Sequence, residues 1–109
     1  MGKFVISVRK DGQFQFNLKA KNGQVILTSE AYTTEAACKN GIASVKKHAA
    51  DPKFFLKKVA TNGKPYFNLL SGNHQVIGSS QMYASAATCN AGIRSVMNNA
   101  PEADIVYKQ

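Results

Sequence analysis

Residues 16–45 read FNLKAKNGQVILTSEAYTTEAACKNGIASV, and residues 67–96 read FNLLSGNHQVIGSSQMYASAATCNAGIRSV. The two stretches align without a gap, so that Phe16 pairs with Phe67 and Val45 with Val96. Self-similarity at a fixed spacing is the signature of a repeated structural unit. The sequence therefore predicts an architecture built by duplication.

Length and composition favour one core that both copies share. The chain has 109 residues, 44% of them hydrophobic and 18% charged, which is typical of a globular protein. Two independent domains of about 50 residues would each bury only about 60% of their unfolded surface, which is marginal. We therefore expect a single compact domain, residues 1–109, with repeat 1 at residues 10–58 and repeat 2 at residues 61–109.

The stretch before residue 20 predicts a β-hairpin. FVISVR at residues 4–9 and QFQFNLKA at residues 13–20 alternate around a Lys-Asp-Gly turn. A two-residue loop would send the apolar side chains of the two strands to opposite faces. A three-residue loop with a left-handed Gly12 places all six on one face. The expected cross-strand pairs are Phe4 with Leu18, Ile6 with Phe16, and Val8 with Phe14.

The third strand is expected at residues 24–29, with Leu18 opposite Ile26. The second copy keeps an isoleucine at residue 77 but has Gly78 where the first copy has Leu27. A glycine at a core position would leave a hole, so Leu27 is predicted to lie outside the core.

Residues 33–49 predict a helix, with Thr33 or Thr34 as its N-cap and Glu35 in its first turn. An apolar stripe at helical spacing consists of Cys38, Ile42, Val45 and Ala49. Gly41 lies beside that stripe, and a mid-helix glycine costs about 1 kcal/mol relative to alanine. Because Gly92 repeats it, we expect close packing there on the sheet or on the other helix.

The second copy predicts strands at residues 54–60, 66–70 and 75–80, a helix at residues 85–99 and a last strand at residues 105–107. Its helix stripe is Cys89, Ile93, Val96 and Ala100. Lys57 stands where the first copy has Ile6, and Pro65 stands where it has Phe14, so Pro65 indicates a strand start or a sheet edge. The expected fold is α+β: two tandem β-β-β-α(-β) repeats with pseudo-twofold symmetry, whose antiparallel sheet packs against two helices.

The repeated pattern FNL…N-x-Q-V-I…S-x-x-Y…C-x-x-G-I-x-S-V resembles the YegP-like family of small uncharacterised bacterial proteins. The resemblance covers nearly the whole chain. It implies tandem α+β units related by pseudo-twofold symmetry. It implies no activity and supplies no catalytic residues, because the family is functionally uncharacterised.

No residue pattern in the chain indicates an enzyme. Cys38 and Cys89 lie on the apolar stripes, where an unpaired cysteine behaves as a small buried hydrophobic residue. Two cysteines without a histidine at ligand spacing make no zinc motif. His48 lies near a helix C-terminus, where the last carbonyls explain it, and His74 lies in a turn. We therefore expect no catalytic, metal-binding or cofactor-binding residues and no cofactor.

Five polar residues recur in both copies and have two interpretations. They could form a twofold binding surface, or they could stabilise the chain where it turns into each helix, and the second interpretation is favoured. They are Asn17/Asn68, Gln24/Gln75, Ser29/Ser80, Tyr32/Tyr83 and Ser44/Ser95.

The net charge of +8 keeps a small protein soluble and also attracts anionic partners. The favoured hypothesis is a small interaction module with an unknown protein partner. The alternative is a basic protein that binds nucleic acid through phosphate contacts. The lysines expected to contact an anion or a nucleic acid are Lys10, Lys19, Lys21, Lys57, Lys58 and Lys64.

The sequence predicts a cytoplasmic monomer whose internal symmetry resembles that of a dimer. The first residues lead directly into a strand pattern, so no signal peptide is expected. No apolar run approaches the roughly 18 residues of a membrane span, so no membrane contact is expected. Reduced thiols fit the cytoplasm.

Overall fold

The structure is a computed structural model that describes residues 2–108. Strands and helices follow the order that the repeat predicts. They are β1 (Lys3–Val8), β2 (Phe14–Lys19), β3 (Val25–Ser29), α1 (Glu35–His48), β4 (Phe55–Val59), β5 (Pro65–Leu70), β6 (Val76–Ser79), α2 (Ala86–Asn99) and β7 (Asp104–Tyr107), with a 3₁₀ turn, η1 (Pro52–Phe54), before β4.

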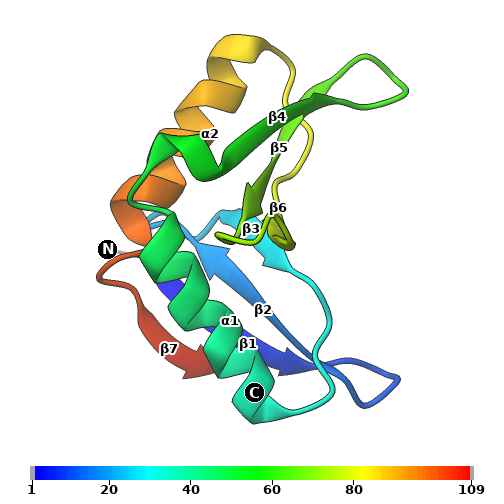
Figure 1. Ribbon diagram of the computed structural model, residues 1–109, viewed down its shortest axis with the longest axis vertical. Helices are drawn as coiled ribbons and strands as arrows, with labels where there is room; N and C mark the ends of the chain where they lie inside the picture. The colour runs from blue at the N-terminus through cyan, green and yellow to red at the C-terminus, as the bar shows by residue number, and fades with distance from the viewer. Residues whose placement is uncertain (1, 109) are drawn as a thin grey trace.

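All seven strands form one continuous sheet in the order β4-β5-β6-β3-β2-β1-β7, and both helices pack on it (Figure 1). The two repeats meet at the centre, where β3 and β6 run antiparallel. The predicted α+β fold is confirmed, but the sheet is mixed, because β7 runs parallel to β1. The expectation of an antiparallel sheet was therefore wrong at this one strand. A strand that follows a helix, rather than a tight hairpin turn, is free to return in the parallel direction.

The first hairpin has the predicted register. Phe4 lies opposite Leu18, Ile6 opposite Phe16 and Val8 opposite Phe14. The Arg9 N–H donates to the Gln13 carbonyl over 2.7 Å, and Gly12 takes the left-handed conformation at φ 83°. Val8 is an exception to the expected core, because 62% of it is exposed at the end of the strand.

The prediction for the third strand was wrong at Leu27. A β-bulge between Leu18 and Lys19 shifts the register, so that Leu18 pairs with Leu27 and both Ile26 and Leu27 are buried. Gly78 leaves no hole, because a Cβ at Gly78 would lie 2.8 Å from Leu27 Cγ. The pseudo-twofold axis brings these equivalent positions together, and the leucine fills the space beside the glycine.

The helices begin as predicted and bury the predicted apolar stripes, but the prediction for their two glycines was wrong. Thr34 caps α1 and Ser85 caps α2, each accepting a hydrogen bond from the backbone of the first turn. All eight residues of the two stripes are buried in one core. The close packing at Gly41 and Gly92 is against neither the other helix nor mainly the sheet. A Cβ on either glycine would collide with the hydroxyl of the tyrosine that precedes its helix, Tyr32 or Tyr83. Each position has a glycine because the tyrosine ring leaves no room for a larger side chain.

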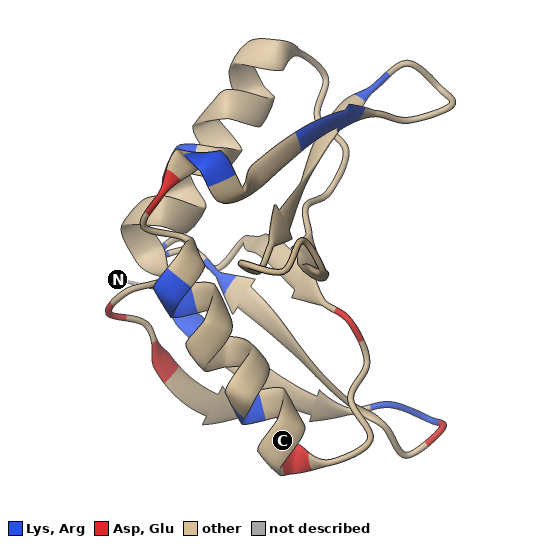
Figure 2. Ribbon diagram, in the orientation of Figure 1, with Lys and Arg blue, Asp and Glu red and all other residues tan. Residues whose placement is uncertain are grey.

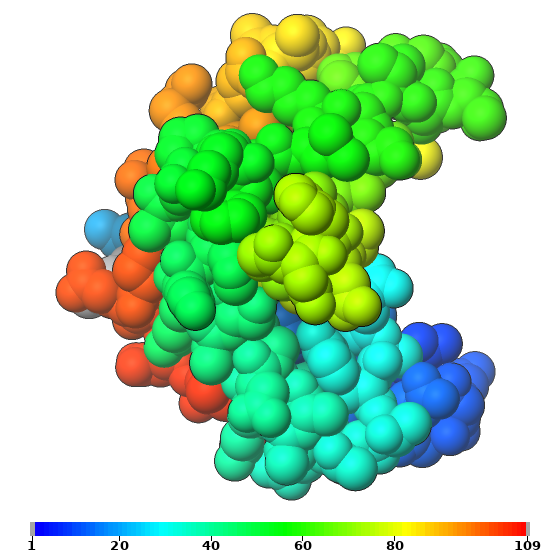
Figure 3. All heavy atoms as spheres, in the orientation of Figure 1, coloured from blue at the N-terminus to red at the C-terminus, as the bar shows by residue number. Residues whose placement is uncertain are grey.

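The two repeats also meet through the β5–β6 turn, which rests against the end of α1 (Figure 3). His48 makes this contact with one ring nitrogen and contacts its own helix with the other. Its Nδ1 lies 2.8 Å from the Ser44 carbonyl, and its Nε2 accepts a hydrogen bond of 3.0 Å from the Gly72 N–H. His48 is therefore a buried link between the repeats, with one ring nitrogen on a carbonyl of its own helix and the other on the β5–β6 turn.

Candidate functional site

The two outer ends of the sheet differ, and the difference defines the candidate site. In the first repeat, the outer edge of β1 is covered by β7 (Figure 1). The Lys108 N–H donates to the Ile6 carbonyl over 2.8 Å. The Tyr107 hydroxyl donates to Glu35 over 2.6 Å, and Lys39 Nζ lies 5.7 Å from the centre of the Tyr107 ring. The last strand thus closes the gap between β1 and α1.

The equivalent strand of the second repeat, β4, has an open outer edge. Among residues 2–108 no strand pairs beyond it, and Val59 is 70% exposed. The Ala60 N–H donates to the Lys64 carbonyl, on the β5 side. Because backbone groups alternate in direction along an antiparallel strand, those of Val59, Lys57 and Phe55 point away from β5. They are available to another strand, as those of Ile6 are to β7.

Between β4 and α2 runs a groove with two hollows, which we call the β4–α2 groove. The first, the Cys89 hollow, has a volume of about 210 Å³, and the second, the Met97 hollow, about 340 Å³. Lys57 and Asn90 line both, so the hollows are adjacent. The Cys89 hollow is also lined by Lys58, Val59, Pro65, Ala86 and Cys89, and the Met97 hollow by Pro52, Phe55, Ile93, Arg94 and Met97.

Sequence differences between the copies explain why this groove is open. The apolar Ile6, which is buried beside α1, is replaced by Lys57, which is exposed. Phe14 exchanges two backbone hydrogen bonds with Tyr32, whereas Pro65 has no N–H and only accepts one from Tyr83. The second copy therefore has smaller or more polar groups where the first fills its groove.

The electrostatics of the groove are positive. Lys57, Lys58 and Arg94 line it, and none of the described lining residues is acidic. The equivalent region of the first repeat is balanced, because Glu35 pairs with Lys39 at 3.2 Å. An unbalanced positive groove attracts acidic groups.

Both thiols are unpaired and buried, as predicted. Burial raises the pKa of Cys38, and the nearby Glu35 raises it further. Burial also raises the pKa of Cys89, which Lys57 partly offsets. A raised pKa leaves little thiolate at neutral pH, so neither cysteine is an activated nucleophile.

The six candidate lysines do not form one patch. Lys57, Lys58 and Lys64 belong to the β4–β5 hairpin, whereas Lys10 belongs to the β1–β2 turn, and the two hairpin tips lie towards opposite ends of the molecule's long axis (Figure 2). Lys19 and Lys21 lie around the β2–β3 turn, beside a separate hollow of about 300 Å³. The structure thus brings the candidates together in two separate groups, Lys19 with Lys21 and the three lysines of the β4–β5 hairpin, and leaves Lys10 apart.

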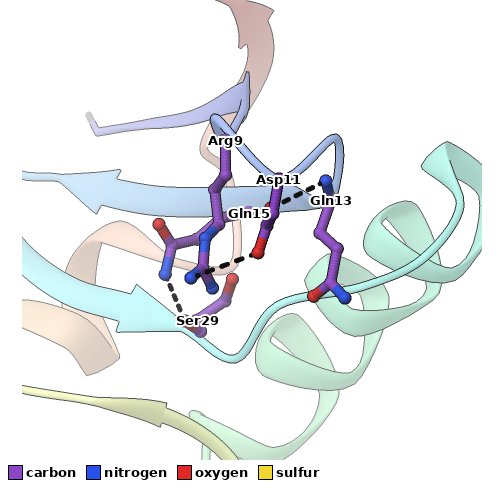
Figure 4. A network of polar contacts seen from close by, with 5 residues as sticks. All are labelled: Arg9, Asp11, Gln13, Gln15 and Ser29. Atoms are coloured by element: carbon purple, nitrogen blue, oxygen red, sulfur yellow. Dashed lines mark hydrogen bonds and ion pairs between the residues drawn. The ribbon is translucent and has the colours of Figure 1, made fainter.

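The two hairpin tips differ in their ion pairs, not in their net charge. In the first, Arg9 pairs with Asp11 at 3.5 Å, and Asp11 accepts a hydrogen bond from the Gln13 N–H (Figure 4). In the second, Asn62 takes the place of Asp11 and accepts from the Lys64 N–H over 3.1 Å. The turn geometry is kept without a carboxylate, and each tip carries a net charge of +1, from Arg9, Lys10 and Asp11 in the first and from Lys64 in the second.

The repeated polar residues stabilise the fold. Ser29 Oγ accepts from the Phe16 N–H and donates to the Glu30 carbonyl, and Ser80 makes the same pair of bonds (Ser29 is drawn beside Gln15 in Figure 4). Tyr32 and Tyr83 stack on Phe16 and Phe67, each at 6.3 Å between ring centres. The structural interpretation of these residues is therefore supported by their contacts.

Sequence reasoning missed the α2 side of the groove, which is formed by Ala86, Asn90, Arg94 and Met97. The sequence signal for the groove was that Lys57 replaces Ile6 and Pro65 replaces Phe14 of the first copy. Their meaning depended on which end of the sheet the last strand covers. Within residues 2–108, no cluster of side chains could hold a metal ion, and no helix is long and apolar enough to cross a membrane.

Comparisons with known proteins agree with the repeat and the fold. The family model described as "Domain of unknown function (DUF1508)" matches twice, at residues 10–55 and 60–106. The UPF0339 protein ACIAD0721 of Acinetobacter baylyi is 53% identical over 104 residues, covering 95% of this chain and 94% of that protein. UPF0339 protein YegP of Escherichia coli K12 is 52% identical over 98 residues, covering 90% of this chain and 89% of YegP.

Two solution NMR structures have the same fold. The E. coli yegP structure, described as a protein of unknown function, gives a TM-score of 0.93 at 48% identity, covering 98% of this chain and 92% of that chain. The UPF0339 protein SO3888 of Shewanella oneidensis gives 0.91 at 48% identity, covering 97% and 90%. With its two repeats, its sequence and its fold in agreement, the chain belongs to the DUF1508 family of proteins of unknown function, which includes YegP.

Proposed function

We propose that this protein is a non-enzymatic interaction module that binds an extended segment of a protein partner at the open edge of β4. One observation carries the proposal: the equivalent edge, on β1, is already occupied by an extended strand, β7. Strand addition to a sheet edge is a common mode of peptide recognition, because backbone hydrogen bonds supply affinity and pockets for alternate side chains supply specificity. The β4 edge has both the backbone groups and the hollows.

The absence of a catalytic role is part of the proposal. The side chains considered as catalytic candidates have other properties or roles. Both thiols have a raised pKa, and His48 links the two repeats. Two unpaired cysteines are consistent with a reducing compartment such as the cytoplasm, and we propose that location.

The test uses the internal symmetry of the chain. A photo-crosslinking residue is placed at position 59, beside the groove, or at position 8, its equivalent in the first repeat. Val59 and Val8 are exposed to similar extents, 70% and 62%. In the native host, position 59 is expected to give adducts with a polypeptide and position 8 to give none.

A proline substitution separates strand addition from other binding. Lys57→Pro removes an N–H that points away from β5, so the β4–β5 pairing is retained while the open edge loses a donor. It is expected to abolish the adducts at position 59, whereas Lys57→Gln, which removes only the charge, retains them at a lower level. Adducts that persist unchanged in Lys57→Pro would exclude strand addition.

Nucleic-acid binding stays the second candidate, because Lys57, Lys58 and Lys64 share one hairpin. Binding of this kind weakens steeply with salt, since each phosphate contact releases a counterion. Failure to shift mixed nucleic acid at about 50 mM salt would remove this candidate.

A further inference from the structure

We infer that the β4–α2 groove selects an acidic segment that runs parallel to β4 and places two apolar side chains, two residues apart, in the two hollows. This inference rests on the proposed function, and it names the chemistry and the direction of the partner.

The direction follows from β7, which shows how this fold receives a strand. β7 runs parallel to β1, with Ile105 opposite Phe4 and Tyr107 opposite Ile6. The repeat equates Phe4 with Phe55 and Ile6 with Lys57. A strand added in the same way places one residue opposite Phe55 and the residue two positions later opposite Lys57.

The two hollows lie where those two side chains would point. Tyr107 extends over Glu35 and Lys39 of α1, and the equivalents of that pair, Ala86 and Asn90, line the Cys89 hollow. Phe55, the equivalent of Phe4, lines the Met97 hollow. Successive side chains of a strand point to opposite faces, so residues two apart enter neighbouring hollows.

The residue in the Cys89 hollow differs in character from Tyr107. Glu35 accepts a hydrogen bond from the Tyr107 hydroxyl, whereas its equivalent Ala86 has no acceptor in its side chain. The hollow is also lined by the apolar Val59, Pro65 and Cys89, and burying an apolar side chain against them is favourable. The hollow therefore favours a side chain without a polar tip, such as phenylalanine, leucine or isoleucine.

The charge of the partner follows from Lys57, Lys58 and Arg94, which line the groove without a described acidic neighbour in the lining. The strand that the first repeat receives has Glu102 before it and Asp104 at its start, and Lys108 follows its end. A second copy of this chain meeting at β4 would place Lys57 and Lys58 of both copies across one strand pair, and like charges opposite each other destabilise it. The partner is thus a separate acidic segment.

The experiment uses the full chain and three synthetic peptides with blocked ends. The probe is Glu-Ile-Glu-Phe-Glu, one control is Glu-Glu-Ile-Phe-Glu, and the other is Lys-Ile-Lys-Phe-Lys. Backbone amide NMR signals of residues 55–59 report binding at the edge. The probe is expected to shift them, with an affinity about tenfold or more above either control. Each control loses either a buried apolar side chain or the attraction of the glutamates to Lys58, which lies on the face of β4 to which they point.

A spin label at either end of the probe reports direction. In the parallel arrangement, a label at the N-terminus of the peptide broadens the Phe55 amide signal more than that of Val59, and a C-terminal label does the opposite. The reverse pattern would overturn the parallel arrangement.

Ala86→Glu is a variant in which the second repeat takes the residue of the first. Glutamate at the first turn of a helix is favourable, so folding is retained. The variant is expected to bind the phenylalanine probe about tenfold more weakly and to prefer the tyrosine version, Glu-Ile-Glu-Tyr-Glu, because the introduced carboxylate would accept from the tyrosine hydroxyl as Glu35 does. If the wild type and the variant had the same preference between the phenylalanine and tyrosine peptides, the aromatic side chain would not lie beside residue 86.

The outcomes separate the inference from the proposed function. Shifts in β4 caused by the lysine control but not by the probe would overturn the acidic partner and leave strand addition intact. Shifts by no peptide, together with crosslinks at position 59 that Lys57→Pro does not change, would overturn both. Self-association that Lys57→Pro removes, measured by sedimentation, would assign the edge to a second copy and overturn the inference.

Discussion

The two repeats have the same interior contacts and differ at the outer edges of the sheet. Both have a capped helix with a buried stripe, a tyrosine stacked on a phenylalanine and a serine that bonds the second strand. At the outer end of the sheet, however, the first repeat is closed by β7 and the second ends in an open strand. Seven strands cannot be divided equally between two repeats. The unpaired position is where duplication leaves a site that a further strand could occupy.

The largest expected effect on stability comes from the centre of the sheet, where Leu27 of one repeat fills the space that Gly78 of the other leaves. Gly78→Leu would place two leucines in the space of one, at an expected cost of about 1–3 kcal/mol in the free energy of unfolding. Leu27→Gly would leave a cavity and cost at least the ~2–5 kcal/mol of a leucine-to-alanine change. Urea unfolding followed by circular dichroism measures both.

The exchange of the two residues is the matched control. The double variant Leu27→Gly, Gly78→Leu supplies one leucine from the other side of the pseudo-twofold axis and is expected to recover most of the stability. If the double variant were as unstable as the sum of the single changes, the leucine would depend on neighbours that the two repeats do not share.

The next expected effect separates the two thiols. Cys38 lies in the repeat that β7 closes, whereas Cys89 forms part of the wall of the open Cys89 hollow. A small thiol reagent is expected to modify Cys89 about tenfold faster than Cys38, because Cys38 needs a larger local opening. Both modification rates are expected to keep rising at a pH above the ordinary pKa of a thiol, since the pKa of each thiol is raised.

Variants with one cysteine each, Cys38→Ala and Cys89→Ala, assign the rates by mass spectrometry. The acidic probe peptide should protect Cys89 and leave Cys38 unaffected. Equal rates for the two thiols would mean that the open groove does not lead to the Cys89 sulfur.

Much of this fold could be predicted from local patterns, because alternation and turn length determine the register of a hairpin. The pairs Phe4–Leu18 and Ile6–Phe16 were obtained in this way. Leu27 was misplaced because its environment depends on Gly78, which lies 51 positions away in the sequence and adjacent across the axis. The prediction assumed that equivalent residues of the two repeats have the same environment. That assumption fails for Leu27 and Gly78, because these two equivalent residues contact each other at the axis.

The candidate site was less predictable for the same reason. Lys57 and Pro65 stood out as departures from the first copy, but they looked like weak points of a strand pattern. Their role in a groove depends on β7 pairing with β1 rather than with β4, a choice made by contacts between distant segments. The six lysines chosen by composition were likewise separated by the fold, which kept only those of the β4–β5 hairpin near the groove.

The smallest expected effect concerns the contact that secures β7 in the first repeat. The Tyr107 hydroxyl, and after it the Lys39 ammonium, donate hydrogen bonds to Glu35 and hold the pKa of its carboxylate below its usual range. A carboxylate whose pKa is lower in the folded state stabilises the fold above its unfolded pKa, roughly pH 4, and this stabilisation is lost as the pH falls through the folded pKa. The second repeat has Ala86 at this position and gains no such stabilisation.

Tyr107→Phe is expected to raise the pKa of Glu35 towards its ordinary value, as measured by NMR titration of the side-chain carboxyl carbon. Glu35→Gln identifies the titrating signal, because it removes the carboxyl while keeping a side chain of similar size. Since Glu35 is exposed, the change in stability should be small, and loosening of β7 should appear first as faster amide exchange at Lys108, whose N–H bonds to Ile6. If Glu35 titrated identically with and without the Tyr107 hydroxyl, β7 would be held by its backbone pairing alone, and an occupant of β4 would need no side-chain anchor at this position either.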